Sequence, residues 1–154
     1  MLRSTPQASL LMVDDDPSIV HLVRRMLQTT FRESLAITST TDPQQAARFL
    51  DESVWDILLT DIDMPHLSGI DLLQRAKRRN AWTQVVFMTG HSTWAHVSEA
   101  MGNGASDYLL KPVDRNDLET VLRDAIVRMQ RWQYALSKSP RQPTERETAA
   151  IVVS

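Results

Sequence analysis

Acidic and anion-binding side chains directly follow short apolar runs in this sequence. Four of the five runs end in this way. The residues concerned are Asp14, Asp15, Asp61, Thr89 and Lys111. If the runs are neighbouring parallel strands, three carboxylates, one hydroxyl and one ammonium group meet at one edge of a sheet.

These groups limit the chemistry of the predicted site. Three carboxylates repel one another, and one of them would have to take up a proton unless a cation lay between them. Mg²⁺ prefers oxygen ligands of this type, and it leaves room for phosphate oxygens. A carboxylate can also attack phosphorus to form an aspartyl phosphate, and phosphoryl transfer mainly requires positioning and positive charge. Lys111 would supply positive charge, and the Thr89 hydroxyl would donate a hydrogen bond to a phosphoryl oxygen.

Each of these residues, taken alone, also has a structural explanation. The acidic run before Pro17 could cap a helix, Asp61 and Thr89 could stand in turns, and Lys111 could be a surface lysine. Their joint occurrence at four strand ends is not explained by turn composition, and it favours a shared site.

Five apolar runs alternate with five helical patterns along the chain. The predicted strands cover residues 10–13, 34–39, 56–60, 85–88 and 108–110. Helices are predicted to begin behind an N-cap at Asp16, at Asp42 with Pro43, after Gly69, near Thr93 and behind an N-cap at Asp114. Because the strands are apolar rather than alternating, both faces of the sheet should be covered. The pattern predicts a doubly wound α/β fold, with a five-stranded parallel sheet flanked by five helices.

The composition excludes several other classes of protein. The chain has 154 residues, of which 42% are hydrophobic, so it can form one domain with a substantial core. Its formal net charge is −2, which gives no sign of nucleic-acid binding, and it has no cysteine and therefore no disulfide. No apolar run is long enough to cross a membrane or resembles a signal peptide. We therefore expect a cytoplasmic protein with no direct contact with nucleic acid or membrane.

Four segments share the order and spacing of one family's motifs. They are LMVDDDP at 11–17, LTDIDMP at 59–65 with Ser68 and Gly69, VFMTG at 86–90, and GASDYLLKP at 104–112. Together they resemble the receiver domain of two-component response regulators over about residues 9–130. The resemblance implies the flavodoxin-like receiver fold. It also implies a bacterial signalling phosphoprotein that catalyses only its own phosphorylation and dephosphorylation.

The resemblance assigns roles within the predicted site. Asp61 would accept a phosphoryl group from a phosphohistidine of a sensor histidine kinase or histidine phosphotransfer protein. Asp14 and Asp15 would hold Mg²⁺ (or Mn²⁺) with Asp61, and Asp15 would be the more direct ligand of the acidic pair. The main-chain carbonyl of Asp63 would be a further ligand, and Lys111 would contact the phosphoryl group.

The resemblance also implies a conformational switch. Thr89 would move its hydroxyl towards the phosphoryl group, and the ring of Tyr108 would turn inward behind it. Gly90 stands where this family commonly has alanine. The side chains of Asp63 and His91 occupy variable positions that tune the lifetime of the phosphoryl group in this family.

Two other functions are compatible with parts of the pattern. Asp61 and Asp63 fit the Asp-x-Asp of haloacid-dehalogenase-type phosphatases, with a later threonine and lysine. Against that interpretation, a strand with its own acidic pair precedes Asp61, and no acidic motif follows Lys111. The second alternative is a receiver-like binding module that is not phosphorylated.

The last helical pattern is longer than a receiver domain requires. Its apolar residues follow 4-3-4 spacing, as in a coiled-coil seam: Leu118, Leu122, Ala125, Met129, Trp132 and Leu136. We expect the last three to extend past the domain body, where they would form a homodimer or lead to an output domain. The predicted boundaries are a flexible segment at 1–8, a receiver domain with an extended last helix at 9–136, and a linker or disordered tail at 137–154.

Overall fold

The computed structural model describes residues 6–90 and 93–139. Within these ranges, five strands alternate with five helices. The strands are β1 (Ala8–Val13), β2 (Leu35–Thr40), β3 (Ile57–Asp61), β4 (Gln84–Thr89) and β5 (Asp107–Leu110). The helices are α1 (Pro17–Thr30), α2 (Pro43–Glu52), α3 (Gly69–Arg79), α4 (Trp94–Gly102) and α5 (Arg115–Lys138). The predicted order of elements is confirmed.

All five strands are parallel and form one sheet in the order β2-β1-β3-β4-β5. After β1 the chain crosses to β2 at one edge, and it then returns to the other side of β1 to form β3. The strand order therefore reverses between β1 and β3, and doubly wound sheets bind their ligands outside the carboxyl ends of the strands at such a point. β1 ends before Asp14, and β3 ends at Asp61.

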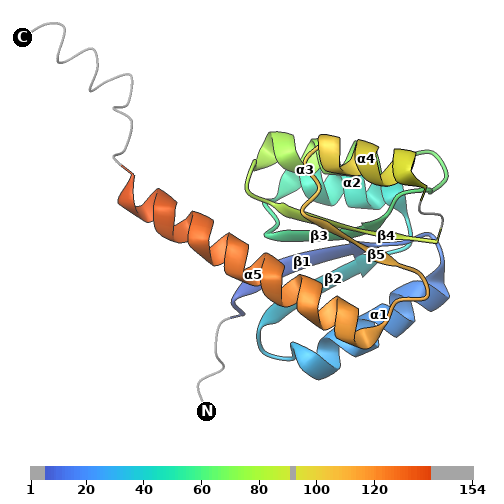
Figure 1. Cartoon of the computed structure of the whole chain (residues 1–154), viewed down its shortest axis with the longest axis horizontal. Coiled ribbons are helices and arrows are strands. Elements are labelled where there is room, and N and C mark those ends of the chain that lie inside the picture. The colour runs from blue at the N-terminus through green and yellow to red at the C-terminus, as the bar shows by residue number, and fades with distance from the viewer. Residues whose placement is uncertain (1–5, 91–92, 140–154) are drawn as a thin grey trace, which may run out of the picture.

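The two faces of the sheet are covered by different helices, as Figure 1 shows. Helices α1 and α5 cover one face, where Leu27 and Leu122 pack against strand residues such as Leu59. Helices α2, α3 and α4 cover the other face, where Leu72 packs among residues such as Phe87. Because both faces are buried, every residue of β3 and β4 is buried, which explains why these strands are continuously apolar or uncharged up to their last residues.

Short polar side chains begin the helices where the sequence predicts. Asp16 and Asp42 each accept a hydrogen bond from the backbone N–H two residues later, and proline follows each of them. Ser68 and Asp71 form a reciprocal capping box at the start of α3. Asp114 caps α5, as predicted. No helix in the described part of the chain is long and apolar enough to cross a membrane.

Helix α5 differs in two respects from its expected form. Met129 is only 4% exposed and packs in the core of the α1–α5 face, so the expectation that it extends past the domain body is wrong. Trp132 and Leu136 are exposed, and the helix continues beyond the predicted boundary at 136 to Lys138. Figure 1 shows this last part of α5 projecting away from the sheet. Residues 140–154, most of the predicted tail, lie outside the described residues.

At the other end of the chain, strand β1 begins at Ala8, before the predicted start of the domain at residue 9. Ala8 is buried, and its N–H donates to the carbonyl of Ser34 at 3.1 Å. The predicted flexible segment at 1–8 is therefore wrong at its last residue. Residues 1–5 are outside the described ranges.

Candidate functional site

Three carboxylates lie together at the carboxyl ends of β1 and β3. One ligand oxygen from each of Asp14, Asp15 and Asp61 lies within 4.8 Å of the other two. Asp14 is fully buried, Asp61 is 8% exposed and Asp15 is exposed. β1 and β3 are neighbours in the sheet, and this brings Asp14 and Asp61 together although 46 residues (15–60) separate them in the sequence.

Lys111 brings a positive charge to this cluster from the end of β5. Its Nζ lies 2.7 Å from Oδ2 of Asp14 and donates a hydrogen bond to Oδ2 of Asp61 at 3.1 Å. The Lys111 N–H also donates to the Thr89 carbonyl at 2.9 Å, which joins the ends of β4 and β5. One ammonium group therefore faces two buried carboxylates, and Asp15 adds a third negative charge close by.

Burial, together with the charges nearby, affects protonation of the Asp14 and Lys111 side chains. Burial raises the pKa of the Asp14 carboxyl more than the nearby Lys111 ammonium lowers it. Burial by itself lowers the pKa of Lys111, but its contacts with Asp14 and Asp61 outweigh that effect and raise this pKa above its usual value. Lys111 is therefore charged at neutral pH. The ionised form of Asp14 is energetically costly in this buried position.

The donor set fits a divalent cation. Oδ2 of Asp14 is buried beside Lys111, yet no donor in residues 6–90 and 93–139 is aligned to hydrogen-bond to it. Carboxylate oxygens are the ligands that Mg²⁺ and Mn²⁺ prefer, and a cation would relieve the repulsion among the three acidic groups. The Asp63 side chain is exposed and is not one of the three clustered carboxylates, so a main-chain contribution from Asp63 stays a prediction.

The loop after β3 holds the Asp61 carboxylate in place. The N–H of Ile62 donates to Oδ1 of Asp61 at 2.7 Å, and the N–H of Gly69 donates to the Ile62 carbonyl at 2.8 Å. Gly69 also approaches the backbone of Asp61 closely, because a Cβ at Gly69 would lie 2.1 Å from the Asp61 carbonyl oxygen. The sequence marked Gly69 only as part of a loop and a motif. Its contact with Asp61 could not be predicted from local pattern.

The predicted switch residues lie on neighbouring strands in different environments. Thr89 is buried at the end of β4, whereas Tyr108 on β5 is 39% exposed. A Cβ at Gly90 would meet no atom within 4 Å, so packing does not require glycine there. His91 lies outside the described residues.

Residues 10–123 match the family model of the response regulator receiver domain. This chain belongs to the response regulator receiver family. The receiver domain so defined includes all the clustered residues, as well as Thr89 and Tyr108. The five-stranded parallel sheet with five helices is the fold of this family.

Curated relatives and a solved structure agree with this assignment. The chain is 32% identical over 138 residues to the transcriptional regulatory protein ZraR of Klebsiella oxytoca, covering 89% of this chain and 30% of that protein. It is 31% identical over 145 residues to the transcriptional regulatory protein CpxR of Escherichia coli K12, covering 94% of this chain and 60% of that protein. A receiver domain protein from Clostridium thermocellum has 30% identity and a TM-score of 0.72, covering 80% of this chain and 97% of that one. This chain thus spans less than two thirds of the length of these two curated relatives.

Replacing Asp14 with asparagine should stabilise the metal-free receiver domain and remove its stabilisation by Mg²⁺. Because the pKa of the Asp14 carboxyl is raised in the folded state, the domain loses stability as pH rises from 3.8 towards that higher folded pKa. Asparagine removes the charge. Its side-chain oxygen can still accept the hydrogen bond that the Asp16 N–H donates to Oδ1 of Asp14 at 2.9 Å in the wild type. For the wild type, Mg²⁺ at 100 times its dissociation constant should add about 2.7 kcal/mol. Thermal unfolding with Mg²⁺ and with EDTA measures both effects.

The matched control is Asp16→Asn, two residues away. Asp16 accepts from the Ser18 N–H and caps α1, a function that asparagine also performs. Its variant should keep the full Mg²⁺ stabilisation. An equal loss in both variants would mean that general surface charge, not the Asp14 site, binds the ion.

Proposed function

We propose that this receiver domain accepts a phosphoryl group from a phosphohistidine onto Asp61 in a reaction that depends on Mg²⁺. The observation that carries the proposal is the contact of Lys111 with Asp14 and Asp61 beside the clustered carboxylates. Membership of the family supports the role of phosphoacceptor in signalling. The phosphodonor would be a sensor histidine kinase or a histidine phosphotransfer protein.

The arrangement around Asp61 suits an in-line displacement at phosphorus. A carboxylate oxygen of Asp61 would form the new bond to phosphorus while the bond from phosphorus to the imidazole nitrogen breaks, and the imidazole would leave with that electron pair. The Ile62 N–H fixes the orientation of the carboxylate through Oδ1. Lys111 lies beside Oδ2, where its ammonium would pair with a phosphoryl oxygen once the acyl phosphate has formed.

A divalent cation would be held by Asp14, Asp15, Asp61 and the main-chain carbonyl of Asp63. When bound, it would supply positive charge to the phosphoryl oxygens. Together with Lys111 it would offset the charge that makes three neighbouring carboxylates repel phosphate.

The phosphoryl group would alter the surface through Thr89 and Tyr108. The Thr89 hydroxyl would donate to a phosphoryl oxygen, which would vacate space for the Tyr108 ring to turn inward. Tyr108 is partly exposed on β5, beside α5, so its movement would change a surface that a partner or output domain can contact.

Incubation with acetyl phosphate and Mg²⁺ tests this function. Intact-protein mass spectrometry should show one added phosphoryl group, and EDTA should prevent the addition. No steady turnover of a generic phosphate ester is expected. Turnover that Asp63→Asn abolishes would instead support the phosphatase alternative. Absence of both labelling and turnover in folded protein would favour the non-phosphorylated binding module.

We further propose that the projecting part of α5 mediates a homodimer or connects to an output domain. Trp132 and Leu136 are 48% and 43% exposed, one helical turn apart on this part of α5. Exposing these two apolar side chains to water does not stabilise an isolated receiver domain. In the homodimer version, Trp132→Ala should lower the mass measured by light scattering after phosphorylation. Gln130→Ala is the control, because this exposed polar side chain lies on the same helix. An unchanged mass in Trp132→Ala would leave only the connection to an output domain.

A further inference from the structure

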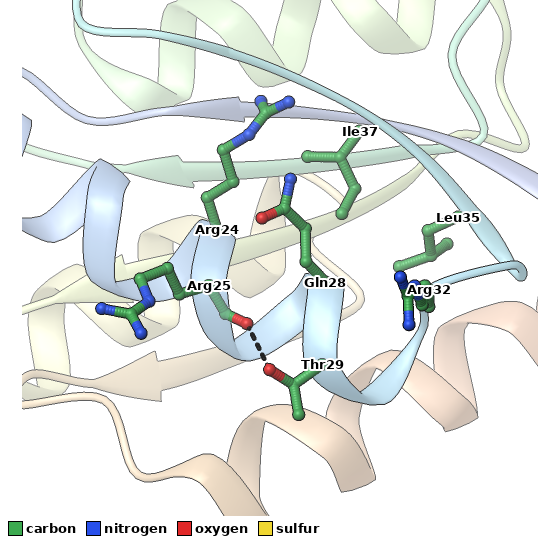
Figure 2. A pocket seen from close by; sticks show the side chains of 7 residues that line it. All are labelled: Arg24, Arg25, Gln28, Thr29, Arg32, Leu35 and Ile37. Carbon is green, nitrogen blue, oxygen red and sulfur yellow. Dashed lines mark hydrogen bonds between the residues drawn. The ribbon is translucent and has the colours of Figure 1, made fainter.

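A groove of about 630 Å³ lies between α1 and β2 (Figure 2), and none of the residues that line it belongs to the aspartate cluster. The apolar side chains of Leu35 and Ile37 contribute to its lining from β2. Three arginines line it from α1 and the turn that follows, namely Arg24, Arg25 and Arg32. No acidic residue lines the groove. It is therefore a basic surface with apolar side chains between its charges.

The arginines of this groove have no acidic partners. None of the ion pairs found in residues 6–90 and 93–139 includes Arg24, Arg25 or Arg32. The guanidinium of Arg24 donates to Oγ of Ser39 at 2.7 Å, which holds it against β2. The chain as a whole carries a formal net charge of −2, so this concentration of positive charge is local. Such a groove attracts an anionic ligand.

The strand beside the groove has a free edge. β2 pairs with β1 alone among the described strands. Ser34 and Thr40 accept hydrogen bonds from the β1 side, at 3.1 and 3.4 Å. Because hydrogen bonding alternates along a parallel strand, the main-chain groups of Ile37 and Ser39 face away from β1. These groups are available to pair with a further strand.

The spacing of the charges matches an extended chain. Arg24 contacts Ser39 on β2, and Arg32 follows Phe31, whose carbonyl accepts from the Leu35 N–H at 3.1 Å; Leu35 and Ser39 are four residues apart, about 13 Å along an extended strand. In an extended strand, residues i and i+4 point to the same face and lie about 13 Å apart. Acidic residues at i and i+4 would therefore reach the two arginines while residue i+2 lies over Ile37.

We propose that this groove binds an extended acidic segment of another protein, which adds a strand to the edge of β2. Carboxylates at i and i+4 would pair with Arg24 and Arg32, since a guanidinium and a carboxylate match in shape and charge. The main chain of the segment would bond to the free groups of Ile37 and Ser39, as in other strand additions. This binding involves none of the residues of the Asp61 site.

The test uses the whole chain and the fluorescein-labelled peptide Ser-Glu-Thr-Val-Thr-Glu-Ser, followed by fluorescence anisotropy. Arg24→Gln and Arg32→Gln should each weaken binding about fivefold, as expected for solvent-exposed charge pairs, and the double variant about 25-fold. Arg48→Gln should have no effect, because Arg48 is an exposed arginine on α2, across the sheet. Circular dichroism and thermal unfolding of each variant show whether the fold is intact, so this result does not depend on the proposed function.

Two further peptides test the geometry. Moving the second glutamate to i+3 places the two carboxylates on opposite faces of the strand. Binding should then fall to the level of a reference peptide in which glutamine replaces both glutamates. Methylating the amide nitrogens on the side that faces β2 should also abolish binding. Equal binding of the i+3 peptide would overturn the proposal, as would duplex DNA or polyphosphate binding through the same arginines while the peptide does not bind. No binding of any probe would mean that the arginines only keep other strands away from this edge.

Discussion

Replacing Asp61 with asparagine is expected to abolish incorporation of a phosphoryl group from acetyl phosphate. The amide has no anionic oxygen with which to attack phosphorus. Its side-chain oxygen can still accept the hydrogen bond that the Ile62 N–H donates to Oδ1 of Asp61 at 2.7 Å in the wild type. The loop after β3 should therefore keep its conformation. Intact-protein mass spectrometry in Mg²⁺ should show the unmodified mass alone.

The control for this variant is Asp51→Asn. Asp51 lies on α2 and forms an exposed ion pair with Arg75 at 2.8 Å, remote from the clustered carboxylates. Its loss should cost no more than about 1 kcal/mol of stability, and labelling should be unchanged. Continued labelling of Asp61→Asn at the wild-type level would place the acceptor elsewhere and overturn the assignment of Asp61.

Replacing Gly69 with alanine is expected to destabilise the receiver domain by about 3 kcal/mol or more. The new Cβ would lie 2.1 Å from the Asp61 carbonyl oxygen, and the obstacle is backbone rather than a flexible side chain. The start of α3 would therefore have to move away from the end of β3. That movement would weaken the hydrogen bond from the Gly69 N–H to the Ile62 carbonyl, which positions the loop after β3. Urea unfolding would measure the loss of stability, and acetyl phosphate labelling in the folded range should also be slower.

The matched control is Gly102→Ala at the end of α4. A Cβ at Gly102 would meet no atom within 4 Å, and Gly102 is not among the residues with positive φ. Alanine there should be neutral or stabilise the protein by up to about 1 kcal/mol, because it restricts the unfolded chain. If Gly69→Ala unfolds at the same urea concentration as Gly102→Ala, the close approach of α3 to Asp61 does not constrain the fold.

The two variants test different aspects of one site. Asp61→Asn removes the oxygen that is proposed to react and leaves its surroundings intact. Gly69→Ala leaves the carboxylate and changes its position. The site contains buried acidic groups whose charge is costly, as the raised pKa of Asp14 indicates. A functional site of this kind therefore reduces the stability of the metal-free domain, and the surrounding core must compensate for that cost.

The element order, the fold class and the family could all be predicted from the sequence. Continuous apolar runs and period-3.6 patterns depend only on which side chains are apolar, so strands such as 85–88 and the helix behind Asp114 could be predicted without tertiary contacts. The convergence of Asp14, Asp61 and Lys111 could also be anticipated, because parallel strands present their carboxyl ends at one edge. Such prediction works where the relevant physics is local or follows from the topology of the sheet.

The tertiary structure was needed to show how distant segments approach one another. It buried Met129 in the core, because α5 remains packed against the sheet for longer than the seam pattern indicates. It placed Gly69 against the Asp61 carbonyl, and it gathered Arg24 and Arg32 beside the free edge of β2. These features depend on packing among elements that are separate in the sequence. Local periodicity carries no information about such distances, and for that reason the sequence did not reveal them.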